Sequence, residues 1–395
     1  MQSKVAVIKV DPQAQIKEIY DPIEDAIGML GNLFDRCPDN GTVLLKPNYG
    51  AARKETDVNP VVTHALAKIL VDNGFKVVIG EDPGFRSKSG YEKWKRYVFE
   101  TTGLKEYMDS IGARVVELRS GNHRTVKVTD PLYFREIEIS DYALDVDMIV
   151  SLAKMKLVNI CSVSLSMKNL KGVMLPDWKH KFHCDSLYQG IVDLNKTVKP
   201  HIAVIDATFA FDQVAGKAFP VGLLIISNNC VAADSVCARI MGLDPAEIEY
   251  IMLAEKAELG TANIDEIEIL GEKLENLVGK YKFSKPVNPF DYAEKSNGDI
   301  EIIQGNPCSA CLNELGNEFR SLGKYREKLK NITILVGPNA EIPDNDRHLV
   351  FYGNCTRKYA NKENYINGCP PGRVSAGTGS LKRYLARRGS PLLNK

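Results

Sequence analysis

The chain has 395 residues, of which 44% are hydrophobic and 26% charged, so it is long enough for two or three domains with packed cores. Its formal net charge of +1 argues against a dedicated nucleic-acid-binding protein. No apolar stretch approaches a membrane span, and the run Val5–Val10 is too short for the core of a signal peptide, so we expect a cytoplasmic protein without a membrane partner.

Residues 1–300 alternate short apolar runs with amphipathic stretches, which predicts an α/β domain with a mainly parallel sheet and crossover helices. The predicted strands are Val5–Val10, Thr42–Leu45, Lys76–Ile79, Arg114–Leu118, Met148–Leu152, Ile202–Ile205, Val221–Ile226 and Ile267–Leu270. The predicted helices begin at Asp21-Pro22 and at Asn59-Pro60, span Tyr91–Ile111 and Cys230–Met241, and begin again at Asp244-Pro245. Residues 120–145 have the pattern of an antiparallel insertion.

Residues 301–395 differ in kind from the rest. A helical stripe that includes Leu315 and Phe319 begins directly after a Cys-x-x-Cys pair. Two short strands, Ile332–Val336 and His348–Tyr352, follow, and a basic helix over about 380–388 ends the pattern. We expect a small, Cys-rich, metal- or cluster-binding domain.

Four of the nine cysteines lie in this C-terminal region, in turns rich in Gly, Asn and Pro: Cys308, Cys311, Cys355 and Cys369. Loops could direct four such thiolates at one centre, and the spacing matches no compact zinc finger. We expect one 4Fe–4S cluster per chain. Structural zinc and unliganded cysteines are the alternatives, and the scattered remaining cysteines favour reduced thiols.

The same region carries 15 Lys/Arg against 8 Asp/Glu, and no acidic residue follows Glu363. The basic residues after that point are Arg373, Lys382, Arg383, Arg387, Arg388 and Lys395. A solvated tail explains them, and so does a docking face for an acidic electron-carrier protein.

Polar and cationic residues follow several of the predicted parallel strands, where open α/β sheets bind ligands. The candidate substrate-binding residues are Lys46, Asn48, Asp82, Lys154, Lys156, Asn169 and Asp206. Such a lysine-rich crevice suits a small anionic molecule, a carboxylate or phosphate. For each lysine, the alternative is a solvated position at the edge of the sheet.

Three residues are candidates for proton transfer: Lys168 and Lys171 in the loop Ser166–Gly172, and His183 in a polar, aromatic segment. For His183, a surface or helix-capping role is the alternative.

These residues carry a resemblance to a known family. The segments that carry it are Val43–Asn48, Asn59-Pro60, Gly80–Gly84, Ser166–Gly172, His183, Asp206 and Ala232–Val236. Over roughly residues 4–270 the chain resembles the bacterial and archaeal domain of unknown function 362. The resemblance implies a cluster here, because such proteins often carry iron–sulfur cysteines in a C-terminal extension. This chain lacks their usual double ferredoxin-like array, so we expect one cluster.

Three functions agree with these observations. The first is an iron–sulfur oxidoreductase or redox partner that holds an anionic substrate in the crevice. The second is a non-redox lyase or isomerase that uses cluster iron or Lys/His chemistry, although four thiolates leave no open iron position. The third is a protein that carries or assembles a metal or a cluster.

Overall fold

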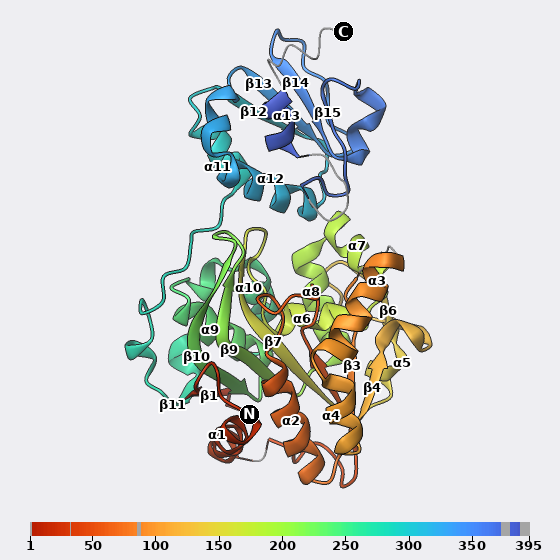
Figure 1. Ribbon diagram of the computed structural model, residues 1–395, viewed down its shortest axis with the longest axis vertical. Helices are drawn as coiled ribbons and strands as arrows, with labels where there is room; N and C mark the ends of the chain where they lie inside the picture. The colour runs from red at the N-terminus through yellow and green to blue at the C-terminus, as the bar shows by residue number, and fades with distance from the viewer. Residues whose placement is uncertain (1, 32, 85–87, 373–379, 388–395) are drawn as a thin grey trace. The chain divides into compact units, whose positions relative to one another are not determined.

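The protein is represented by a computed structural model that describes residues 2–31, 33–84, 88–372 and 380–387. The chain divides into two units, whose folds are drawn in Figure 1. Unit 1 comprises residues 1–157, 163–182 and 186–284, and unit 2 comprises 158–162, 183–185 and 285–395.

The division at Ser284 falls before the boundary expected at residue 300. The helix α11 (Pro289–Glu294) packs with the helix α12 (Ser309–Ser321) of unit 2. The rings of Tyr292 and Phe319 stack there, with 4.6 Å between their centroids. Because burying stacked aromatic rings is favourable, helix α11 belongs to the core of unit 2 although it lies before residue 300.

Unit 1 is built on a nine-stranded sheet whose main path runs β11-β1-β10-β9-β7-β2-β3-β4, with β8 paired to β7. The strands are β1 (Lys4–Lys9), β2 (Thr42–Pro47), β3 (Lys76–Glu81), β4 (Arg114–Glu117), β7 (Met148–Val158), β8 (Ser162–Val163), β9 (Ile202–Asp212), β10 (Lys217–Ser227) and β11 (Glu268–Gly271). Pairs β9–β7, β7–β2, β2–β3, β3–β4 and β1–β11 are parallel, which confirms the mainly parallel α/β fold.

Strand β10 is antiparallel to both of its neighbours, β1 and β9. It follows β9 directly through a short turn, so the two strands form a hairpin rather than a crossover unit. The expected antiparallel insertion is present as a separate pair, β5 (His123–Lys127) with β6 (Glu136–Ser140).

Helices cover both faces of the unit 1 sheet (Figure 1). One face packs against α1 (Ile16–Leu30), α2 (Pro60–Asp72) and α4 (Leu104–Ser110). On the other side α9 (Cys230–Ile240) contacts β1, β9 and β10, and α8 (Leu187–Val198) packs with α10 (Glu249–Lys256). Parallel sheets are normally buried on both faces in this way.

The first helix begins earlier than predicted. Helix α1 starts at Ile16, where Gln15 and Glu18 form a capping box, and Pro22 lies inside the helix rather than in its first turn. Ile19 and Ile23 are both fully buried on the side facing the sheet. Their burial outweighs the backbone hydrogen bond that proline removes from a helix interior.

Unit 2 has its own parallel sheet, which the sequence pattern did not reveal in full. Its order is β12 (Ile300–Gln304), β13 (Ile332–Val336), β14 (His348–Tyr352) and β15 (Tyr365–Ile366), with all three pairs parallel. Helices α12 and α13 (Leu381–Arg387) contribute Leu315, Phe319 and Leu385 to its core. This unit is therefore an α/β fold.

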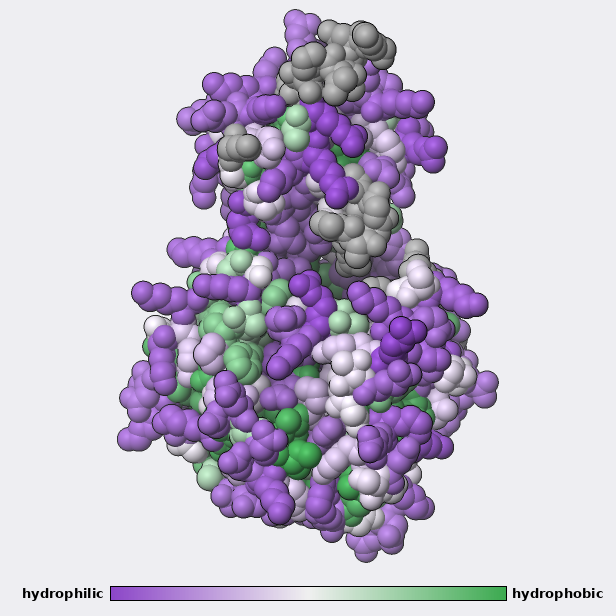
Figure 2. All heavy atoms as spheres, viewed as in Figure 1, coloured by the Kyte–Doolittle hydropathy of each residue, from purple (hydrophilic) through white to green (hydrophobic). Residues whose placement is uncertain are grey.

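Hydrophilic side chains cover most of the visible face of each unit in Figure 2. Within the described ranges, no helix combines the length and apolar character that a membrane span requires.

Candidate functional site

Lys46 lies at the end of β2 and its side chain is completely buried. Its ammonium donates to the Glu81 carboxylate at 2.6 Å, to Asn169 Oδ1 at 3.0 Å and to the Pro47 carbonyl at 2.8 Å. Burial lowers the pKa of Lys46, and the Glu81 carboxylate opposes that shift. Three acceptors match the three donors of an ammonium, so Lys46 ties β2 to β3 and to the Asn169 loop.

Two further carboxylates at this edge of the sheet are paired with cations. Asp206 is fully buried and accepts from Lys154 at 2.9 Å and from the backbone N–H of Asn59 at 2.7 Å. Asp82 accepts from Lys179 at 2.6 Å and also pairs with Arg119. Although burial opposes the shift, Arg119 and Lys179 together hold the pKa of Asp82 below its usual range.

Lys154 and Lys156 lie inside β7, which continues to Val158, rather than in a loop after the strand. Lys156 is partly buried, and its ammonium hydrogen-bonds Asn48 Oδ1. Asn48 Nδ2 in turn donates to Asn169 Oδ1 at 3.1 Å. The structure therefore brings Lys46, Asn48, Lys156 and Asn169 into one hydrogen-bonded chain at the carboxyl edge of the sheet.

Asp234 of α9 holds the segment that carries Asn169. This fully buried carboxylate accepts from the backbone N–H groups of Ser166 at 2.8 Å and Met167 at 3.2 Å, from the Ser166 hydroxyl, and from Tyr250 OH at 3.2 Å. Burial raises the pKa of Asp234 to about 6. Asp234 therefore fixes the start of α6 (Ser166–Asn169).

The proton-transfer candidates are divided between the units. Lys168 is partly buried on α6, and Lys171 is buried with its ammonium 5.9 Å from the centre of the Phe182 ring, both in unit 1. His183 belongs to unit 2, where its Nδ1 lies 2.7 Å from Ser309 Oγ. Their catalytic roles remain predictions.

The four predicted ligand cysteines all belong to unit 2, and three of them follow carboxyl ends of its parallel strands. Cys308 follows β12 and precedes α12, Cys355 follows β14, and Cys369 follows β15. Cys311 lies in the first turn of α12. The thiols are close enough for Cys311 to interact electrostatically with the other three.

Several hydrogen bonds hold these loops together. The Asn354 N–H donates to the Gly368 carbonyl at 2.9 Å, and the Gly368 N–H donates to Asn354 Oδ1 at 2.8 Å. Gly353 has a φ of 98°, and a Cβ there would lie 3.5 Å from the Cys311 sulfur. The turn before Cys355 therefore needs the left-handed backbone that glycine adopts at low cost.

Hydrogen-bond donors surround the Cys308 sulfur. It accepts from the thiols of Cys311 and Cys184 and from the backbone N–H groups of Cys311 and Ala310. These contacts, led by the Cys311 thiol and opposed by burial, lower the pKa of Cys308 to about 6. The Cys355 sulfur similarly accepts a backbone N–H from Gly337. Cys311 is buried, whereas Cys355 and Cys369 are exposed.

Within the part of the chain that the structure describes, no three His, Cys, Asp or Glu side chains form a group arranged to hold a single metal ion. The cysteines thus lie near one another without converging on one point. Three of the predicted basic-tail residues, Lys382, Arg383 and Arg387, lie on α13; Arg373, Arg388 and Lys395 lie outside the described residues.

The sequence analysis did not select the partners of two of its candidates. Glu81 pairs with the candidate Lys46, and Arg119 and Lys179 pair with the candidate Asp82. A signal was available, since a lysine in a buried strand needs a carboxylate partner and Glu81 ends the adjacent strand. The sequence analysis gave Gly172 no role of its own, although a Cβ at that position would lie 2.1 Å from Lys46 Cε.

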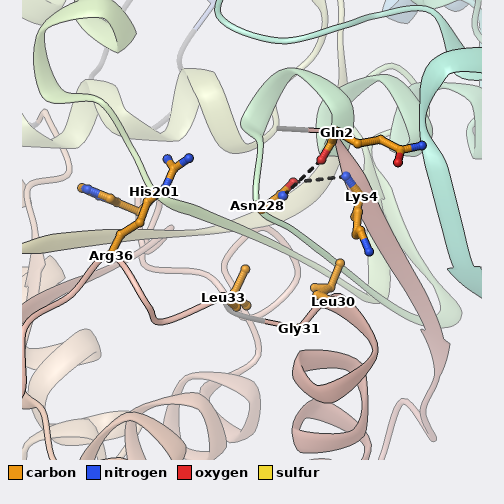
Figure 3. Close-up of a pocket in the computed structure, with 8 residues that line it drawn as sticks. All are labelled: Gln2, Lys4, Leu30, Gly31, Leu33, Arg36, His201 and Asn228. Carbon is orange, nitrogen blue, oxygen red and sulfur yellow. Dashed lines mark hydrogen bonds between the residues drawn. The ribbon is translucent and has the colours of Figure 1, made fainter.

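A cavity of about 360 Å³ lies at the opposite, amino-terminal edge of the unit 1 sheet (Figure 3). Two of its basic side chains are engaged in the fold. Lys4 pairs with Glu268 at 3.3 Å, and the imidazole of His201 accepts the Ile149 N–H at 3.1 Å through Nδ1. Burial, followed by the nearby Arg36 charge, lowers the pKa of His201. We assign this cavity no function.

Comparison with known proteins finds a family match over part of the chain. Residues 43–239 match the family described as a domain of unknown function (DUF362), which confirms the resemblance for that segment. The "Thylakoid-associated protein sll1697" of Synechocystis sp. is 26% identical over 291 residues, which cover 71% of this chain and 85% of that protein.

Among solved structures, the lactate racemase apoprotein from Thermoanaerobacterium thermosaccharolyticum is similar with a TM-score of 0.39 and 13% identity. The likeness covers 85% of this chain and 69% of that chain. It is too distant to bear on activity.

Proposed function

We propose that unit 2 binds one 4Fe–4S cluster through Cys308, Cys311, Cys355 and Cys369, and that the protein is an iron–sulfur oxidoreductase or redox partner. The observation that carries this proposal is the grouping of the four thiols at the carboxyl edge of one parallel sheet. Four cysteine thiolates are the usual ligand set of such a cluster.

The donor set fits the cluster in two further respects. The backbone N–H groups directed at the sulfurs of Cys308 and Cys355 are of the kind that tunes cluster reduction potentials. In a 4Fe–4S cluster each thiolate binds a different iron, so its four sulfurs do not need to converge on one ion. Zinc, in contrast, requires all four sulfurs at about 2.3 Å from one metal.

The exposure of the cysteines supports electron transfer rather than a structural role. Cys355 and Cys369 are exposed, so that side of the cluster would be accessible to a partner. When bound, the cluster would accept and donate single electrons. Arg357 and Lys358 follow Cys355 closely and are exposed, which suits docking of an acidic electron-carrier protein.

The crevice of unit 1 supplies the second half of the proposed function. Its partly buried Lys156 and Lys168 contribute positive charge that suits a small anionic substrate. The polar and cationic lining suits a carboxylate or phosphate.

The cluster proposal is tested by anaerobic purification followed by iron, sulfide and zinc analysis and electron paramagnetic resonance. We expect about four irons and four sulfides per chain and a visible absorbance that bleaches on reduction. Replacing any one of the four cysteines with serine should remove most of the iron. The matched control is Cys37→Ser in unit 1, which should keep it. A colourless protein with one zinc would refute the proposal.

The docking proposal has its own test. We expect the rate of cluster reduction by an acidic ferredoxin or flavodoxin to fall several-fold in an Arg357→Glu, Lys358→Glu variant and to fall with added salt. Lys330→Glu is the control, because Lys330 is exposed but lies before β13, at the opposite end of the strands from the cysteines. Equal effects of both variants would contradict docking beside Cys355.

A further inference from the structure

Lys156 differs from the other lysines of the crevice in how its ammonium is satisfied. Lys46, Lys154 and Lys179 each donate to a carboxylate, at 2.6, 2.9 and 2.6 Å. Among the residues that the structure describes, Lys156 Nζ has one hydrogen-bond acceptor, the neutral amide of Asn48, and it forms no ion pair. An ammonium has three donors, so two remain for a bound molecule.

Burial disfavours the protonated form of Lys156 and is the largest effect on its pKa. Among the charges, the Asp57 carboxylate has the largest effect and opposes burial, Lys154 and Lys168 act in the same direction as burial, and Glu81 opposes it. Together these effects lower the pKa of Lys156 to about 8. The Asp57 carboxylate accepts hydrogen bonds from the backbone N–H groups of Ala51 and Arg53, both at 3.1 Å, and within the described residues it forms no ion pair with Lys156.

The side chain is also held in place. Asn48 accepts from Lys156 and donates to Asn169 Oδ1 at 3.1 Å, and Asn169 donates to the Lys46 carbonyl at 2.9 Å. The amide of Asn48 is thus oriented with its oxygen towards the lysine. A lysine that is desolvated, positioned and flanked by other cations has the features of a nucleophilic amine.

We propose that Lys156 is a nucleophilic amine that binds small 2-oxo acids as an imine. The neutral amine attacks the carbonyl carbon, a C–N bond forms, and the two amine protons leave with the carbonyl oxygen as water. The step needs no oxidant or reductant. The positive charge of Lys168 selects the acid, since it attracts the carboxylate beside the reacting carbonyl. This activity belongs to unit 1 and does not depend on the cluster.

The test uses the full chain and pyruvate as the probe. The protein is incubated with pyruvate and sodium cyanoborohydride, which reduces an imine to a stable secondary amine, and the modified lysines are located by peptide mass spectrometry. We expect modification of Lys156 to exceed that of the exposed Lys127 at least tenfold. Lys154 serves as an internal control, because its ammonium donates to the buried Asp206 carboxylate at 2.9 Å, and it should stay unmodified.

Labelling with a second ketone and labelling of two variants test the specificity of the reaction. Acetone, which has the carbonyl but no carboxylate, should label Lys156 at least tenfold less than pyruvate. The variant Lys156→Arg keeps the cation and should lose the label, and Cys308→Ser should keep it, which separates this inference from the cluster proposal. Labelling that is absent, or spread evenly over exposed lysines, would overturn the inference. Because the label is mapped in the wild-type protein, the inference does not depend on the folding of any variant.

Discussion

Replacing Gly172 with alanine should destabilise unit 1 more strongly than a single added methyl group usually does. Gly172 lies in the turn after α6, directly against the buried Lys46–Glu81 pair. A Cβ there would be 2.1 Å from Lys46 Cε, 2.6 Å from Lys46 Nζ and 2.3 Å from Glu81 Oε1. All three distances are well below van der Waals contact, so the pair must move.

The size of the effect follows from what the methyl group displaces. Overpacking a well-packed core typically costs about 1–3 kcal/mol. Breaking a buried ion pair costs about 3–5 kcal/mol, because the remaining charges are left without partners. The ammonium of Lys46 can retain some of its contacts by shifting with the turn. We therefore expect the free energy of unfolding to fall by about 3 kcal/mol.

Both tryptophans, Trp94 and Trp178, lie in unit 1, so urea unfolding followed by tryptophan fluorescence reports on that unit alone. The matched control is Gly28→Ala, since Gly28 lies in α1 with no atom within 4 Å of an added Cβ. That change should be neutral or stabilise by up to about 1 kcal/mol, because alanine favours helix. A Gly172→Ala variant within about 0.5 kcal/mol of wild type would refute the reasoning.

Three further predictions concern unit 1 and are all measured by the same urea unfolding. His64 is stacked on Tyr107, and burial lowers its pKa to about 4, so its contribution to the free energy of unfolding is present above pH 6.5 and is lost as pH falls towards 4. His64→Phe should remove up to about 3 kcal/mol of this dependence of stability on acid pH. An unchanged pH dependence in the variant would contradict this. Asn59→Ala should lower the free energy of unfolding by about 1 kcal/mol, because the Asn59 side chain accepts the Val61 N–H at 3.1 Å and caps α2. Asn59→Ser should retain most of that stability. No loss with alanine would argue against the cap. Asp82→Asn should lower the free energy of unfolding by about 3 kcal/mol, because Arg119 and Lys179 lose their carboxylate partner. The control Asp109→Asn, at the exposed end of α4, should lower it by under about 1 kcal/mol. Equal losses in the two variants would contradict the special role of Asp82.

Local sequence patterns were sufficient for much of the fold. The period of apolar residues located β2, β3, β13 and β14 to within two residues at each end. The Asn59-Pro60 pair correctly marked the start of α2, because a cap is a hydrogen bond between neighbours in the chain. Cysteine spacing and turn residues selected four thiols that lie near one another, and the cluster that they would bind stays a proposal.

Tertiary structure decided the features that depend on residues far apart in the chain. The antiparallel placement of β10 between β1 and β9 depends on long-range pairing, which no local pattern encodes. The start of α1 at Ile16 reflects burial of Ile19 and Ile23 against the sheet.

The same distinction applies to the crevice. The sequence placed its lysines at one edge of the sheet, because the side-chain types and the strand ends can be read directly. Whether a lysine holds the fold together or remains able to bind a ligand depends on the carboxylate that reaches it. Lys46 donates to Glu81 and Lys154 donates to Asp206, whereas among the described residues Lys156 donates to an amide, that of Asn48. Those distances are set by the packing of strands and loops distant in sequence, so only the folded chain distinguishes the three.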